Sequence, residues 1–161
     1  DINGEPYLYD FIVTSCHYLS SKDLFIQANN IMKKKLINLK NNMIMLAKGK
    51  ETSISVKNLD NSPSTYSFII PDEDDTLGNV IQSHIAINFI DEKSLVNICS
   101  YKRSHPLEEH IILTFGINPK HKLFNSTDEV KLNAIVKYLE DVINELSTIY
   151  DEIISVSEKS L

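Results

Sequence analysis

The chain has 161 residues and a formal net charge of -6, with 16 Lys and Arg against 22 Asp and Glu. This acidic balance disfavours direct nucleic-acid binding as the main task, because neutralising phosphates requires clustered lysines and arginines. Hydrophobic residues make up 42% of a length that suffices for one sizeable core, and no apolar run reaches the roughly 20 residues of a membrane span, which predicts a soluble globular protein.

The first predicted elements are a strand over residues 7–16 and the long helix that follows it. Residues 7–16 are rich in Tyr, Phe, Ile and Val, which favours a buried strand. Ser20 and Asp23 approximate a capping box, and Gly49 is a plausible end for the helix. Apolar residues recur between them at spacings of three and four, which predicts an amphipathic helix. Its apolar face consists of Leu24, Ala28, Ile31, Met32, Leu36, Leu39, Met43 and Leu46.

A hairpin and a short helix follow. The apolar period changes to two over residues 54–70, with a polar turn at residues 60–63, and this pattern predicts a β-hairpin. The acidic run at residues 72–75 then leads into an amphipathic stripe that ends at Asn88, which predicts a short helix with Asp75 or Thr76 as its N-cap. His84 lies on this stripe, where a half-buried histidine with satisfied hydrogen bonds is favoured over a ligand.

A second strand pair and a long helix complete the chain. Residues 95–102 and 110–117 have strand composition, and His105 and Pro106 stand in the turn between them, since proline has no amide for a ladder. Apolar residues then repeat at three and four from Leu132 to Ile153, which predicts a helix that packs against another helix. The predicted interface joins the two long helices through Ala28, Ile31, Leu36, Leu39, Leu132, Ile135, Leu139, Val142 and Leu146.

These elements predict an α+β fold with a four-stranded antiparallel sheet, a short helix and a long helix, preceded by an additional strand and long helix. Two units follow from this order. Residues 1–50 hold the first strand and helix, and residues 51–161 hold the sheet and its two helices.

Catalytic chemistry finds little support in the sequence. The four acids at 72–75 are candidates for a metal site, but consecutive carboxylates point in different directions, so a helix cap is favoured. The five histidines have no Cys partners at zinc spacing, and neither a nucleophile elbow nor a phosphate-binding glycine loop is present. Cys16 and Cys99 are too few for a disulfide framework, which favours a reducing compartment. We therefore expect no catalytic residue, metal or cofactor.

Two motifs carry a family resemblance. An acidic residue followed by Thr-Leu-Gly-Asn, and then Tyr-Lys-x-x-His-Pro-Leu, resemble the small alpha-like subunit of archaeal and eukaryotic RNA polymerases, which is the archaeal L subunit and the eleventh subunit of RNA polymerase II. The resemblance covers residues 52–161. The family usually has His at the position of Asp75. The motif residues, which the resemblance assigns to subunit contacts, are Asp75, Thr76, Leu77, Gly78, Asn79, Tyr101, Lys102, His105, Pro106 and Leu107.

Residues 1–50 resemble a different part of the same assembly. Their strand, polar turn and capped helix are similar to the C-terminal strand and helix of the larger alpha-like subunit, the third subunit of RNA polymerase II or the archaeal D subunit. Joined alpha-like halves resemble the fused subunits of large cytoplasmic DNA viruses of the asfarvirus type. This implies a cytoplasmic location, in a viral factory or virion, or the nucleus for a cellular protein. Because the chain opens at Asp1, we expect it to be part of a longer protein.

The resemblance implies a non-catalytic assembly platform of a DNA-directed RNA polymerase. The two alpha-like halves would pair within one chain, and the pair would dock the two large catalytic subunits and small polymerase subunits, without direct contact to nucleic acid or membrane. Two alternatives from other classes stay open. One is a free-standing adaptor that homodimerises through the last helix, and the other is an enzyme that binds a divalent metal at the acidic run.

Overall fold

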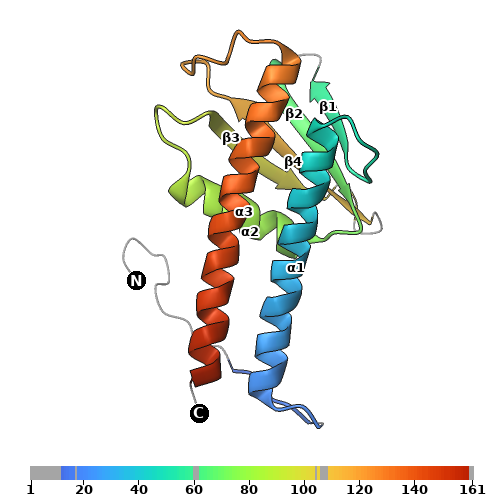
Figure 1. The fold of residues 1–161 in the computed structure, drawn as a ribbon, viewed down its shortest axis with the longest axis vertical. Helices are drawn as coiled ribbons and strands as arrows, with labels where there is room; N and C mark the ends of the chain where they lie inside the picture. Colours follow the sequence, from blue (N-terminus) through green and yellow to red (C-terminus); the bar gives the residue numbers. More distant parts are fainter. Residues whose placement is uncertain (1–11, 17, 60–61, 104, 106–108, 160–161) are drawn as a thin grey trace.

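A computed structural model describes residues 12–16, 18–59, 62–103, 105 and 109–159. Three helices and four strands follow one another in the described residues (Figure 1). In chain order they are α1 (Ser21–Ala47), β1 (Ser55–Leu59), β2 (Ser62–Pro71), α2 (Asp75–Asn88), β3 (Val96–Lys102), β4 (His110–Ile117) and α3 (Asp128–Lys159).

The strands form one antiparallel sheet with the order β1-β2-β4-β3. Phe68 of β2 pairs with Leu113 of β4, which pairs in turn with Tyr101 of β3. Because side chains alternate along a strand, Phe68 and Phe115 lie on the same face, where their rings meet edge to face at a centroid distance of 5.7 Å. The predicted α+β fold with a four-stranded antiparallel sheet is confirmed.

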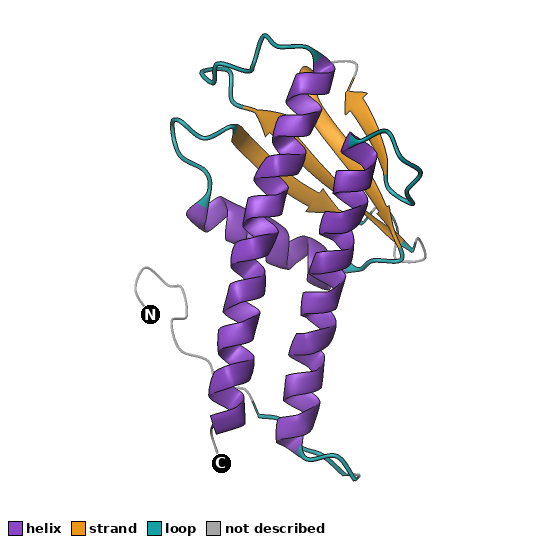
Figure 2. Cartoon of the chain, viewed as in Figure 1, coloured by secondary structure: helices purple, strands orange, loops and turns teal. Residues whose placement is uncertain are grey.

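All three helices lie on one face of the sheet (Figure 2). The upper parts of α1 and α3 run side by side over the strands, and α2 crosses the lower end of the sheet. Leu36 of α1, Ile81 of α2 and Ile135 of α3 are fully buried in the same cluster as Phe68 and Phe115. One core therefore joins both predicted units of the chain.

The lower parts of α1 and α3 extend past the sheet (Figure 1). We call residues 21–35 and 147–159 the stalk, because none of them is buried, whereas Leu36 and Leu146 next to them are. None of the helices in the described part of the chain is long and apolar enough to span a membrane.

The strand predicted over residues 7–16 is not formed in the part that the structure describes. Residues 12–16 have no strand hydrogen bonding, and residues 7–11 lie outside the described residues. A strand needs a neighbour with which to pair its backbone. Residues 12–16 lie at the free end of the stalk, away from the four strands (Figure 1).

The apolar face predicted for α1 is wrong at two positions in its first half, Ala28 and Ile31. Ala28 is exposed and Ile31 is 54% exposed, while Met32 packs against the core. The less exposed side continues Leu36 backwards at alternating spacings of four and three through Met32, so the contradicted positions Ala28 and Ile31 each lie one residue, or about 100° of rotation, from it. Its members are Phe25, Asn29, Met32, Leu36, Leu39 and Met43.

A pair of substitutions tests this assignment. Leu39→Ala removes a side chain that is 3% exposed, so we expect a loss of about 2 to 5 kcal/mol in the free energy of unfolding. Ile31→Ala changes an exposed position, and the expected change is below about 1 kcal/mol. Urea denaturation followed by circular dichroism measures both. An equal loss in the free energy of unfolding in the two variants would show that Ile31 does belong to the packed interface.

Candidate functional site

The first candidate surface is the interface between α1 and α3. The helices run antiparallel, because residues near the start of one contact residues near the end of the other. Lys22 Nζ donates to the carbonyl oxygen of Glu158 over 2.7 Å, and Lys40 Nζ donates to Asn144 Oδ1 over 2.9 Å. Such exposed contacts fix orientation more than they add stability.

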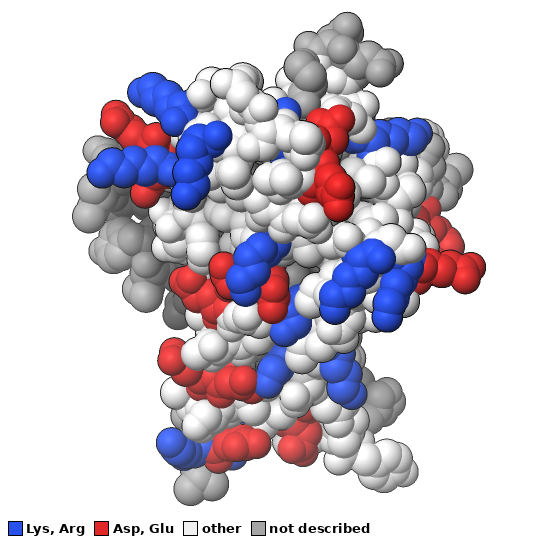
Figure 3. Space-filling view, turned by 45° about the horizontal axis from the view of Figure 1, so that its top comes forward, with Lys and Arg blue, Asp and Glu red and all other residues white. Residues whose placement is uncertain are grey.

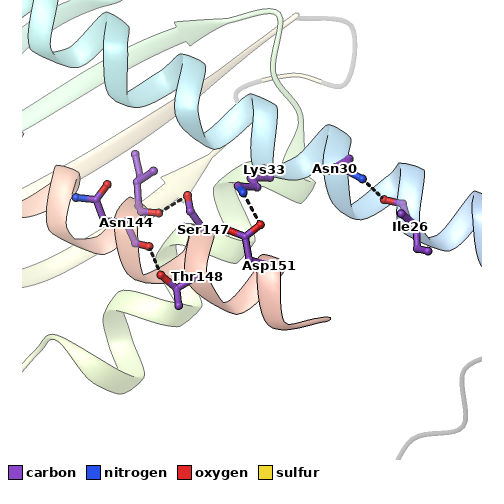
Figure 4. Close-up of polar contacts among 8 residues, drawn as sticks. Ile26, Asn30, Lys33, Asn144, Ser147, Thr148 and Asp151 are labelled. Atoms are coloured by element: carbon purple, nitrogen blue, oxygen red, sulfur yellow. Dashed lines mark hydrogen bonds and ion pairs between the residues drawn. The ribbon is translucent and has the colours of Figure 1, made fainter. Parts of the chain in front are cut away.

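Polar side chains in and beside the stalk mostly bond within their own helix (Figure 4). Asn30, Ser147 and Thr148 each donate to a backbone carbonyl four residues earlier. Lys33 instead reaches across to form an ion pair with Asp151. Figure 3 shows acidic and basic side chains together on this narrow part of the molecule.

The structure places most of the predicted interface residues in the core. Leu36 and Leu39 of α1 are buried, Leu132 of α3 is half-buried, and Ala28 and Ile31 are exposed. The remaining predicted residues, all on α3, are at most 5% exposed: Ile135, Leu139, Val142 and Leu146. The upper half of the interface is thus a closed apolar contact, and the stalk is its open continuation.

A groove runs along the stalk. It has a volume of about 400 Å³, and Phe25 of α1 lines it together with α3 side chains that include Ile149 and Ile153. Ile149 is 37% exposed. Phe25 is not among the predicted interface residues, although its spacing of seven from Met32 places it on the same helix face.

The second candidate surface begins at the N-terminus of α2. Its N-cap is Asp74 rather than the predicted Asp75 or Thr76, and Asp74 Oδ1 accepts the backbone N–H of Thr76 over 2.9 Å. Burial opposes ionisation of Asp74, but hydrogen bonds from Thr76 and the positive charge of Lys35 outweigh it, so the pKa of Asp74 lies below its usual value. An ionised cap also favours the positive end of the helix dipole.

The other acids of the run have separate contacts. Glu73 accepts from Lys35 Nζ over 2.7 Å, and this bond raises the pKa of Lys35. The carboxylate Oδ2 of Asp75 lies 3.9 Å from Arg103 Nη1. Asp72 has a φ of 58°, in the left-handed region, and its N–H donates to the carbonyl of Glu109. In the described part of the chain no three His, Cys, Asp or Glu side chains lie close enough together to hold a metal ion.

The two sequence motifs meet at Gly78 and Tyr101. A Cβ built on Gly78 would lie 2.6 Å from Tyr101 Cδ2 and 2.8 Å from its Cγ, so the glycine admits the ring against α2. Beside this contact a cleft of about 380 Å³ is lined by Asp75, Tyr101, Lys102 and Arg103. Arg103, the one arginine of the chain, is not among the predicted motif residues.

The motif residues divide into a buried and an exposed set. Leu77 and Gly78 are buried and Tyr101 is half-buried. Pro106 and Leu107 lie outside the described residues. We call the exposed set the motif surface; it consists of Asp75, Thr76, Asn79, Lys102 and His105.

Replacing Gly78 tests the contact between the motifs. Gly78→Ala should lower the free energy of unfolding by about 1 to 3 kcal/mol, because the new methyl group overlaps the base of the Tyr101 ring. In a Tyr101→Ala background the same change should cost less, since the ring is gone and alanine is the better helix former. A double-mutant cycle by urea denaturation measures the difference. An identical cost in both backgrounds would contradict the proposed overlap.

Comparison with known proteins agrees with this geometry. Residues 65–155, which run from β2 to near the end of α3, match the RNA polymerase Rpb3/Rpb11 dimerisation domain. The chain is also similar to the probable DNA-directed RNA polymerases I and III subunit RPAC2 of Caenorhabditis briggsae, with 33% identity over 114 residues that cover 71% of this chain and 70% of the relative. On these matches the chain belongs to the Rpb3/Rpb11 dimerisation family of DNA-directed RNA polymerase subunits.

Proposed function

We propose that the chain is a non-catalytic assembly platform of a multisubunit RNA polymerase, in which two alpha-like halves pair and dock the large subunits. The observation that carries the proposal is the antiparallel packing of α1 on α3 above an open stalk. A platform needs a rigid centre and surfaces left over for partners. The closed upper interface supplies the first and the stalk supplies the second.

The pairing of two halves within one chain rests on the position of α1. The family match begins at residue 65, so α1 lies outside it. Yet α1 contributes Leu36, Leu39 and Met43 to the core, and in this role it resembles a helix supplied by a partner. We infer that residues 1–50 belong to a second, third-subunit-like half. Covalent linkage raises the effective concentration of the two halves and so favours their pairing.

The remainder of that second half would cover the stalk. α1 and α3 each present an upper segment to the sheet of this chain and a lower segment beyond it. A second sheet placed at the lower end would bury Phe25, Ile149 and Ile153 as the present sheet buries Leu36 and Leu139. The homodimerising adaptor is less well supported, because the α3 residues that it would use are already buried against α1 and the sheet.

Copurification tests the role of the stalk. Ile149→Glu places a charge in the groove, and we expect it to reduce recovery of the large subunits about tenfold or more, because the charge would be buried where the second alpha-like half covers the stalk. The matched control is Ile87→Glu on α2, a position 79% exposed and off the stalk. Equal recovery of partners with both variants would refute the proposed stalk contact.

The same assay tests the motif surface. Lys102→Glu reverses an exposed charge beside the cleft, and we expect weaker recovery of a large subunit with an unchanged melting temperature. Lys57→Glu makes the same charge change on the exposed side of β1, at the opposite edge of the sheet. If Lys57→Glu lowers recovery as much as Lys102→Glu, net charge and not the motif surface governs docking.

A further inference from the structure

The imidazole of His84 is buried with one nitrogen lacking a hydrogen bond. The side chain is 10% exposed, and its Nε2 is the one buried side-chain polar atom without a hydrogen-bond partner among the residues that the structure describes. Sequence reasoning expected a satisfied histidine at this position, and that expectation is wrong for Nε2. A buried, unsatisfied polar atom is costly, so its surroundings call for an explanation.

Asn88 determines which nitrogen carries the proton in the neutral ring. Its Nδ2 lies 3.2 Å from the backbone oxygen of His84 and 3.1 Å from His84 Nδ1. A carbonyl oxygen only accepts, so the amide nitrogen of Asn88 faces it, and the same nitrogen donates to Nδ1. The proton of the neutral ring is therefore on Nε2.

Nε2 points across to the stalk-bearing helix α3. It lies 3.4 Å from Glu145 Oε1, without the geometry of a hydrogen bond. Glu145 is half exposed, so its carboxylate has room to close on the ring. The ring also packs on Phe89, which packs edge to face on Tyr138 of α3. His84 thus sits where the end of α2 meets α3.

We propose that His84 and Glu145 form a proton-controlled latch between α2 and α3. In the charged ring both nitrogens carry protons: Nε2 donates to the Glu145 carboxylate, and Asn88 rotates its amide to present oxygen to Nδ1. Asn88 is exposed, so water replaces the bonds that its nitrogen gives up. Acid pH then tightens the contact, because an imidazolium facing a carboxylate makes a charge-assisted bond.

Other titratable groups around the ring do not compete for this role. Asp141, one turn before Glu145 on α3, is engaged by Lys137 at 3.2 Å, and Lys137 also holds Glu140. Burial raises the pKa of Tyr138, with smaller contributions from Cys99 and Asp91, and burial raises the pKa of Cys99 to about 12. Both groups stay neutral at and below neutral pH. The latch concerns the fold of this chain and does not depend on the proposed function.

Thermal unfolding at two pH values tests the latch. At pH 5.5, where an ordinary imidazole is charged, Glu145→Gln should lower Tm by about 2 to 4 °C relative to the unchanged chain. At pH 8, well above the pKa of an ordinary imidazole, the difference should shrink to less than half of that value. His84→Gln should remove the effect of Glu145→Gln at pH 5.5, because no charge remains to pair.

The control is Glu152→Gln, which makes the same charge change at an exposed position seven residues further along α3. It should show no such pH-dependent difference. Nitrogen chemical shifts of the His84 ring provide an independent readout, with the proton on Nε2 at pH 8. A Glu145→Gln effect that is equal at both pH values, or is matched by Glu152→Gln, or a neutral ring protonated on Nδ1, would overturn the latch.

Discussion

The fold depends on the antiparallel contact between α1 and α3 over the sheet. Three α1 side chains, Leu36, Leu39 and Met43, are at most 3% exposed, and burying each contributes about 1.5 to 3 kcal/mol. Together they amount to about 5 to 9 kcal/mol, which is comparable with the whole stability of an ordinary domain. The sheet alone would leave one side of α3 uncovered, so α1 is part of the fold and not an appendage to it.

α2 links that contact to the motif surface. Its N-terminus is capped by Asp74 and lies beside the end of β3 through Gly78 and Tyr101, while its C-terminal end meets α3 at His84 and Tyr138. Lys35 of α1 adds a third connection, because its side chain forms an ion pair with Glu73, which lies just before α2. The exposed motif residues are therefore held at fixed positions relative to α1 and α3, as contact between large, preorganised surfaces requires.

Local patterns predicted the positions of the helices and strands well, but they predicted less well which side of α1 packs into the core. Period-two alternation placed β2 and β4, and a glycine with a φ of 64° follows α1 where the sequence suggested an end. The facing side of α1 could not be predicted in the same way, because Leu24, Phe25 and Ile31 offer apolar residues on several sides of the helix. Packing against α3 determines which of these sides is buried. Because α3 lies about a hundred residues further along the chain, a local pattern does not include it. The predicted N-cap of α2 was wrong because each of four consecutive acidic residues can cap a helix, and the local sequence does not distinguish among them.

The stalk has features that an isolated helix pair would not retain. Its helices have no buried residue, exposed ion pairs such as Lys33 with Asp151 add little, and short helices without tertiary packing are marginal in water. Nevertheless the apolar spacing of the closed interface continues into it, through Met32 and Phe25 on α1 and Ile149 and Ile153 on α3. A polar sequence would have kept these segments helical with less exposed apolar surface. A covering partner requires such a continuation of the apolar stripe, and this is the physical argument for the proposal that a second alpha-like half covers the stalk.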